Sequence, residues 1–96
     1  MAVYMIGALD VHDVEKFKKY SEGAARTSRA NGAEVLAVGT PLAHEGCAPA
    51  STMALLKFPD QAAFDAWYNS AEYLEVKPLR FESGTSRIFV TLQGLP

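Results

Sequence analysis

The chain has 96 residues, of which 49% are hydrophobic, a composition that is ordinary for one globular domain and far too apolar for a disordered chain. The formal net charge is −2, so the chain lacks the basic character that is typical of nucleic-acid-binding proteins. We therefore expect a single domain over residues 1–96 with no nucleic-acid partner.

The first ten residues carry no positively charged segment, and their apolar run is too short for a signal peptide or a membrane span. The single cysteine, Cys47, cannot form an internal disulfide, which fits a reducing compartment. These features predict a cytoplasmic protein with no membrane association.

The first half of the chain predicts a strand, a helix and a second strand. An apolar run favours a strand at 2–9, and another favours a strand at about 33–40. Between them, Asp13 is a predicted helix N-cap and Asn31-Gly32 a predicted helix end. The helix between these two signals carries one apolar stripe at helical spacing, formed by Val14, Phe17, Tyr20 and Ala24.

The second half repeats this order. Strands are predicted at about 51–58 and 87–92. Asp60, after Pro59, is a plausible cap for a helix with an aromatic stripe, and Ser70 can cap a further short helix. Pro78 should end or bend that second helix, because proline disfavours helical backbone at the residue before it.

Two successive βαβ units of about 45 residues are typical of the split-βαβ, ferredoxin-like arrangement. The predicted fold class is therefore α+β, a βαββαβ domain with a four-stranded antiparallel sheet and its helices on one face.

The predicted strands are apolar on both faces, which a half-solvated strand should not be. In the first strand, Val3 and Met5 point to one face while Tyr4 and Ile6 point to the other. Helices on one side can cover only one face, and the second would be an exposed apolar patch. We expect a second copy of the chain to cover it across a two-fold axis.

The stretch from Phe58 to Arg80 also carries a family resemblance. Its sharpest signals are Phe58-Pro59, Trp67-Tyr68, Ser70, Glu72-Tyr73, Lys77 and Leu79-Arg80, with weaker signals at Asp13 to Tyr20, Glu45-Gly46 and Gly94. With these residues, essentially the whole chain resembles the domain of unknown function family 1330 (DUF1330), in the dimeric α/β-barrel superfamily. The resemblance implies a ferredoxin-like protomer and a homodimer. The superfamily includes cofactor-free monooxygenases, isomerases, haem-degrading enzymes and ligand-binding domains, so the resemblance leaves the activity open.

Three aromatic residues, Trp67, Tyr68 and Tyr73, are candidate ligand-binding residues for a small aromatic or apolar molecule. The alternative is that they only pack the helices on the sheet.

Arg80 is the strongest polar candidate, because a guanidinium beside an apolar cavity can hold a carboxylate or enolate through paired hydrogen bonds. The alternative is an ion pair with Glu72, Glu75 or Asp10. His44 and His12 are candidate general bases, since histidine titrates near neutral pH, and the alternative for each is an exposed loop histidine.

The motifs for bound cofactors are missing from the sequence, which has neither a phosphate-binding loop nor a dinucleotide fingerprint. His44 and Cys47 alone fall short of a zinc site, so we predict no metal and no cofactor. Together these features predict a small homodimer that binds a small organic molecule, with Arg80 and His44 as candidate catalytic residues for cofactor-free oxidation or isomerisation. The alternative is a non-catalytic ligand-binding or structural dimer.

Overall fold

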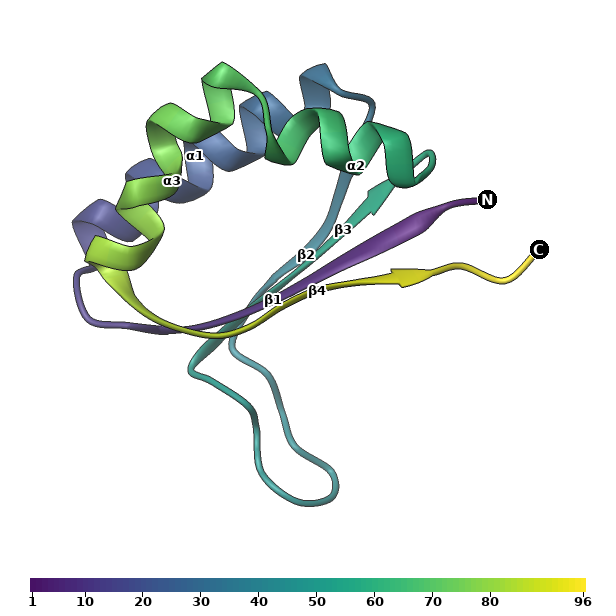
Figure 1. Ribbon diagram of the computed structural model, residues 1–96. Coiled ribbons are helices and arrows are strands. Elements are labelled where there is room, and N and C mark those ends of the chain that lie inside the picture. Colours follow the sequence, from purple (N-terminus) through teal and green to yellow (C-terminus); the bar gives the residue numbers. More distant parts are fainter.

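The computed structural model describes residues 1–96 and has two layers, with helices packed on one face of a twisted sheet (Figure 1). Its elements in chain order are β1 (Val3–Val11), α1 (Val14–Ala30), β2 (Glu34–Gly39), β3 (Thr52–Phe58), α2 (Gln61–Tyr68), α3 (Ala71–Ser83) and β4 (Gly84–Gln93). The strand order is β2-β3-β1-β4 and every neighbouring pair is antiparallel. The predicted ferredoxin-like fold class, with the helices on one face, is confirmed. None of the helices has the length and apolar character that crossing a lipid bilayer requires.

The helix starts follow the predicted caps. The side chains of Asp13, Asp60 and Ser70 accept hydrogen bonds from backbone N–H groups three residues later, at the starts of α1, α2 and α3. α1 ends at the predicted Asn31-Gly32, where Gly32 has a φ of 85° that suits glycine. Local capping chemistry therefore fixes where each helix begins.

Two boundaries in the C-terminal half differ from those expected, because Pro78 does not end its helix and the last strand starts earlier. α3 continues through Pro78 to Ser83, and β4 begins directly afterwards at Gly84 rather than at 87. Proline removes one backbone hydrogen bond from a helix interior, but the buried face of α3 continues on both sides of Pro78, with Tyr73 before it and Arg80 after it. Tertiary packing therefore outweighs the local preference of the proline.

One face of the sheet builds the core against the helices. Val3 pairs with Phe58 and Met5 with Leu56 across β1 and β3, and all four side chains are buried. Trp67 and Tyr73 complete the centre of this core from α2 and α3. The predicted stripe of α1 is correct for Tyr20, which is buried, and wrong for Val14, which is exposed.

α1 and α3 pack closely at a glycine. A Cβ atom built on Gly23 would lie 2.5 Å from a methyl carbon of Val76, closer than real Cβ contacts, so only glycine fits without a shift. This close approach places Tyr20 of α1 beside the aromatic residues of α3.

The other face of the sheet carries no helix. Antiparallel partners share a face, so the pairs Ile6–Leu55 and Ile6–Val90 place three aliphatic side chains in one row on it. Tyr4 lies in the next row beside Leu92 and Lys57. We call this surface, formed by Tyr4, Ile6, Leu55, Lys57, Val90 and Leu92, the open sheet face.

Candidate functional site

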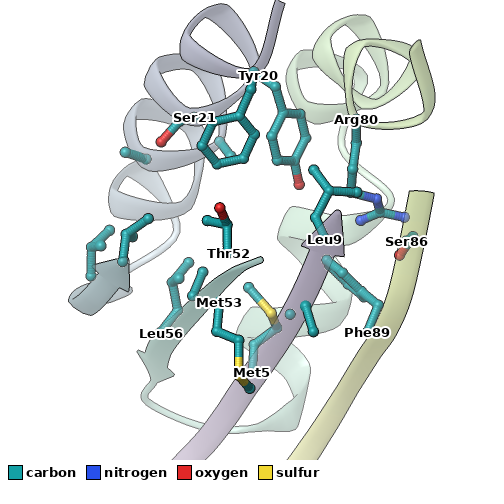
Figure 2. A pocket seen from close by; sticks show the side chains of 18 of the residues that line it. Met5, Leu9, Tyr20, Ser21, Thr52, Met53, Leu56, Arg80, Ser86 and Phe89 are labelled. Atoms are coloured by element: carbon teal, nitrogen blue, oxygen red, sulfur yellow. The ribbon is translucent and has the colours of Figure 1, made fainter. Parts of the chain in front are cut away.

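A cavity lies between the sheet and the helices (Figure 2). Twenty residues line it, and fifteen of them are hydrophobic. Arg80 is the single charged residue among the other five. Its volume is about 70 Å³, against the 10–15 Å³ or so that one water molecule needs. We call it the sheet–helix cavity; its main walls are Met5, Leu9, Tyr20, Leu56, Arg80 and Phe89.

Arg80 lies in the last turn of α3, where helical backbone and the packing of α3 on the sheet turn it inward. It is only 6% exposed. Its Nη1 donates a hydrogen bond of 2.9 Å to the Tyr73 hydroxyl, while its Nε has no hydrogen-bond partner. The guanidinium carbon lies 4.0 Å from the centre of the Phe89 ring and 4.8 Å from that of Phe81. Aromatic rings thus hold this cation by cation–π contacts.

The ion pair that was the alternative for Arg80 is not formed. Glu72 and Glu75 are exposed on α3, and Asp10 pairs with Arg87 instead. Burial by itself lowers the pKa of Arg80, but the neighbouring hydroxyl groups of Tyr20 and Tyr73 outweigh it and raise that pKa. The cavity therefore contains a permanent positive charge with no carboxylate to balance it.

Tyr73 is fully buried beside Arg80 and does not line the cavity itself. Its hydroxyl lies 2.8 Å from that of Tyr20, and the two rings meet edge to face. Burial, followed by the proximity of Tyr20, raises the pKa of Tyr73, so it remains a neutral phenol at neutral pH. Its placement makes it a support for Arg80.

Tyr20 is the residue at this site that the sequence prediction missed. It is buried and lines the cavity from α1. Its position in the apolar stripe of α1 indicated only a core residue, and its contact with Tyr73 depends on how α1 packs against α3. The one available signal was a polar tip on that apolar stripe.

Trp67 lines the cavity and is fully buried. Its indole Nε1 donates a hydrogen bond of 2.9 Å to Thr27 Oγ1, which in turn donates to the Gly23 carbonyl at 2.7 Å. Its polar group is thus satisfied within the protein, and it offers the cavity only its apolar ring.

Tyr68 lies beyond the cavity wall and is partly buried, stacked on Phe64. The Lys77 ammonium lies 4.4 Å from the centre of its ring. Lys77, and to a smaller extent Arg80, lowers the pKa of Tyr68 against the opposing effect of burial. Tyr68 is therefore close to Arg80 without contributing to the lining.

His44 is not brought to the cavity. It is exposed in the connector between β2 and β3, which extends away from the helices in Figure 1. Cys47 is exposed in the same connector, and no group of three or more His, Cys, Asp or Glu side chains is arranged to hold a metal ion. In a single chain, His44 and Arg80 do not form a common site.

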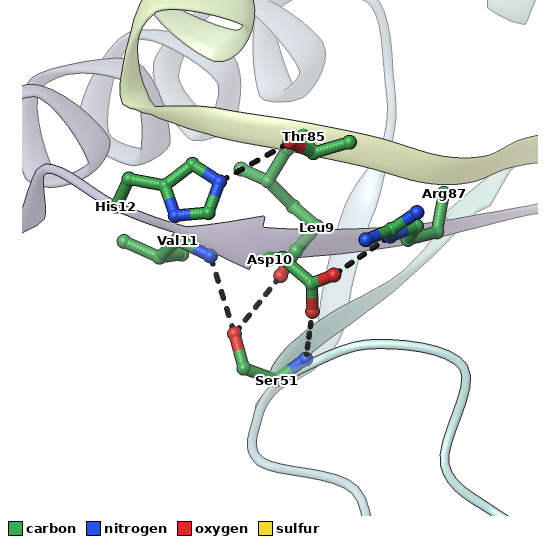
Figure 3. Close-up of polar contacts among 7 residues, drawn as sticks. All are labelled: Leu9, Asp10, Val11, His12, Ser51, Thr85 and Arg87. Atoms are coloured by element: carbon green, nitrogen blue, oxygen red, sulfur yellow. Dashed lines mark hydrogen bonds and ion pairs between the residues drawn. The ribbon is translucent and has the colours of Figure 1, made fainter.

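A polar cluster ties β3 and β4 to the end of β1 (Figure 3). Asp10 accepts hydrogen bonds from Arg87 Nε at 2.7 Å and from the Ser51 backbone N–H at 2.9 Å. These contacts, that of Arg87 first, lower the pKa of Asp10. His12 bonds to Thr85 Oγ1 at 3.1 Å in the same region. The cluster is exposed and is consistent with a structural role.

The fold and the cavity define the class of protein, which is a ferredoxin-like domain with an apolar, arginine-bearing cavity between its sheet and its helices. Solved structures agree on the fold. A dimeric ferredoxin-like protein of unknown function from Jannaschia sp. CCS1 superposes with a TM-score of 0.79 at 13% identity, covering 98% of this chain and 100% of that one.

Two further structures are similar. The RPA0582 protein of unknown function from Rhodopseudomonas palustris has a TM-score of 0.78 at 17% identity, covering 99% of this chain and 83% of that one. The N63A mutant of SnoaB, a cofactor-independent oxygenase from Streptomyces nogalater, has a TM-score of 0.70 at 19% identity, covering 97% and 92%. At these identities the likeness shows the fold alone.

The protein belongs to the DUF1330 family, described as a domain of unknown function, whose model matches residues 2–95. The predicted family membership is thereby confirmed. Comparison with curated proteins gives no match.

Proposed function

We propose that the protein is a homodimer that binds a small organic molecule, aromatic or carboxylate in character, in the sheet–helix cavity. The observation that carries the proposal is Arg80, a buried cation with no carboxylate partner and an unbonded Nε in an apolar cavity. Burying an uncompensated charge is costly, and a bound anion would offset that cost. Apolar walls with a few placed polar groups are the usual composition of small-molecule sites.

The open sheet face supports the homodimer. Val90 and Leu92 are 48% and 63% exposed on it, beside Ile6 and Leu55. Soluble monomers rarely expose contiguous apolar patches above about a few hundred Å². A second copy of the same face would cover this surface by a two-fold contact, and one similar structure is itself described as dimeric.

The candidate chemistry is cofactor-free oxidation or isomerisation, in which Arg80 would orient an anionic substrate. The likeness to a cofactor-independent oxygenase supports this chemistry by analogy of fold. Trp67 and Phe89 would contact the body of the substrate, while Tyr73, with Tyr68 nearby, would support Arg80. His44 is assigned no part in the cavity of its own chain.

A non-catalytic dimer is the second candidate, and one observation favours it. The cavity of about 70 Å³ is smaller than the cavity of roughly 150 Å³ that accepts benzene in an engineered protein. On this alternative, the interior is filled by the protein's own side chains.

A thermal-shift panel of phenols, quinols and small carboxylates separates the two candidates. We expect at least one carboxylate to raise the melting temperature of the wild type, and Arg80→Met to abolish that ligand-dependent rise. Arg29→Met is the matched control, because Arg29 also lies in the last helical turn, of α1, but is exposed. No rise with any compound would contradict ligand binding and favour the second candidate.

A further inference from the structure

The hydrogen bonds around Tyr73 have one consistent direction. A guanidinium only donates, so the Tyr73 oxygen accepts the bond from Arg80 Nη1. Tyr73 is fully buried, and the one other group within hydrogen-bonding distance of its hydroxyl is the Tyr20 oxygen. The Tyr73 proton must therefore be donated to Tyr20, because in the reverse direction it would have no acceptor. The donated hydrogen bonds thus form a series from Arg80 to Tyr73 and from Tyr73 to Tyr20.

This direction leaves the Tyr20 proton free. Tyr20 accepts from Tyr73 and makes no other side-chain hydrogen bond, while its hydroxyl lies at the cavity (Figure 2). Arg80 Nε–H is a second donor with no acceptor in the protein. Both donors belong to groups bonded to the same Tyr73 oxygen, so they lie at the same end of the cavity.

The charge on Arg80 strengthens the free donor. Bonds in a hydrogen-bonded chain polarise one another where water is excluded. Because the cation of Arg80 donates the first of these hydrogen bonds, it draws electron density through Tyr73 and makes the Tyr20 hydroxyl a better donor. The chemistry at this end of the cavity therefore consists of two donors beside a positive charge.

We infer that Tyr20 and Arg80 together select ligands that present an oxygen acceptor, a carboxylate or an enolate, on a small apolar body. The inference rests on the proposed ligand-binding function and narrows it by adding Tyr20 as a ligand-binding residue. A ligand whose polar group only donates, such as an ammonium ion, leaves both donors unpaired and adds charge repulsion. The cavity of about 70 Å³ admits only small ligands, and the flexible side chain of Met5 is suited to adjust to their shape.

Butyrate and butylammonium test this inference, because they have the same hydrocarbon body and opposite polar groups. We expect butyrate to bind the wild type and to shift the ¹⁵N–¹H resonance of Arg80 Nε, assigned by its absence in Arg80→Lys. Butylammonium is expected to leave that resonance in place. Tyr20→Phe should weaken butyrate binding about tenfold, the ordinary loss for a hydrogen bond to a charged group.

Tyr4→Phe is the matched control, since Tyr4 lies on the open sheet face, and it should bind butyrate as the wild type does. A structural role of Tyr20 alone would lower the melting temperature without changing the preference for butyrate over butylammonium. Butyrate binding that requires Arg80 but is unchanged in Tyr20→Phe would overturn the role of Tyr20 and leave the proposed function in place.

Two further results would also be decisive. If phenols bind and butyrate does not, the inferred ligand class is wrong while cavity binding stands. If no compound of any class binds, both proposals are overturned.

Discussion

Arg80 donates a hydrogen bond of 2.9 Å to the Tyr73 hydroxyl, so a neutral phenol rather than a carboxylate holds the buried cation of this protein. A phenol orients the guanidinium but leaves its charge uncompensated. This relationship distinguishes the site from a structural ion pair and leaves Arg80 available to an anion.

Removing the Tyr73 hydroxyl should destabilise the protein. In Tyr73→Phe, Arg80 Nη1 loses its acceptor in a buried position, and we expect the free energy of unfolding to fall by about 1–3 kcal/mol. Tyr4→Phe, on the open sheet face, should change it by less than about 0.5 kcal/mol. Urea unfolding of both variants measures the difference, and equal stabilities would show that the Arg80–Tyr73 bond is not important for folding.

Thr27 should matter through its hydroxyl. Thr27→Val leaves the Trp67 indole N–H without its acceptor, and we expect a loss of about 1–3 kcal/mol. Thr27→Ser keeps the hydroxyl and should lose only the burial of one methyl group, about 0.8 kcal/mol. Because Trp67 is the only tryptophan, its fluorescence during unfolding reports on this contact. A larger loss for serine than for valine would be incompatible with the assigned bond.

The pH dependence of stability should include Asp10. Its pKa is lowered in the folded state by Arg87 and the Ser51 backbone, so its contribution is complete above the ordinary value of 3.8 and is lost as the pH falls further. Asp10→Asn should therefore lose stability less steeply than the wild type below about pH 4. Arg87→Met should flatten the same part of the curve, and the double variant should add little. If the stability of both single variants fell with pH as steeply as that of the wild type, this ion pair would be ruled out as a source of acid sensitivity.

The open sheet face should be the dimer contact. Val90→Glu places a charge on this face, where Val90 is 48% exposed, and Leu74→Glu places one on α3, where Leu74 is 50% exposed. In the proposed dimer only the first charge is buried, so we expect Val90→Glu to be monomeric and Leu74→Glu to remain dimeric. Sedimentation velocity at micromolar concentration measures both. A monomeric wild type would remove the basis for the homodimer.

The sequence was sufficient for the fold because the decisive signals are local. Asp13, Asp60 and Ser70 cap the helices that they were expected to cap, and two apolar faces on β1 predicted an uncovered surface. The path of α3 through Pro78 was not predictable, because packing on both sides of the proline outweighs its local preference.

The site was only half predictable. Tyr73 and Arg80 were each selected for their chemistry, but they share one helix only because α3 continues through Pro78, which the sequence did not predict. Tyr20 reaches them across the contact between α1 and α3, and no local pattern shows that contact. His44 was selected for its titration range and its place in a predicted loop, and the structure places it in an exposed connector away from the cavity.

A crystal structure of the protein grown with butyrate tests the central claim most directly. We predict that the carboxylate lies within hydrogen-bonding distance of Arg80 Nε and the Tyr20 hydroxyl, with its hydrocarbon chain against Met5 and Phe89. A cavity closed by the protein's own side chains, with butyrate absent from it or bound only at surface lysines, would contradict the account.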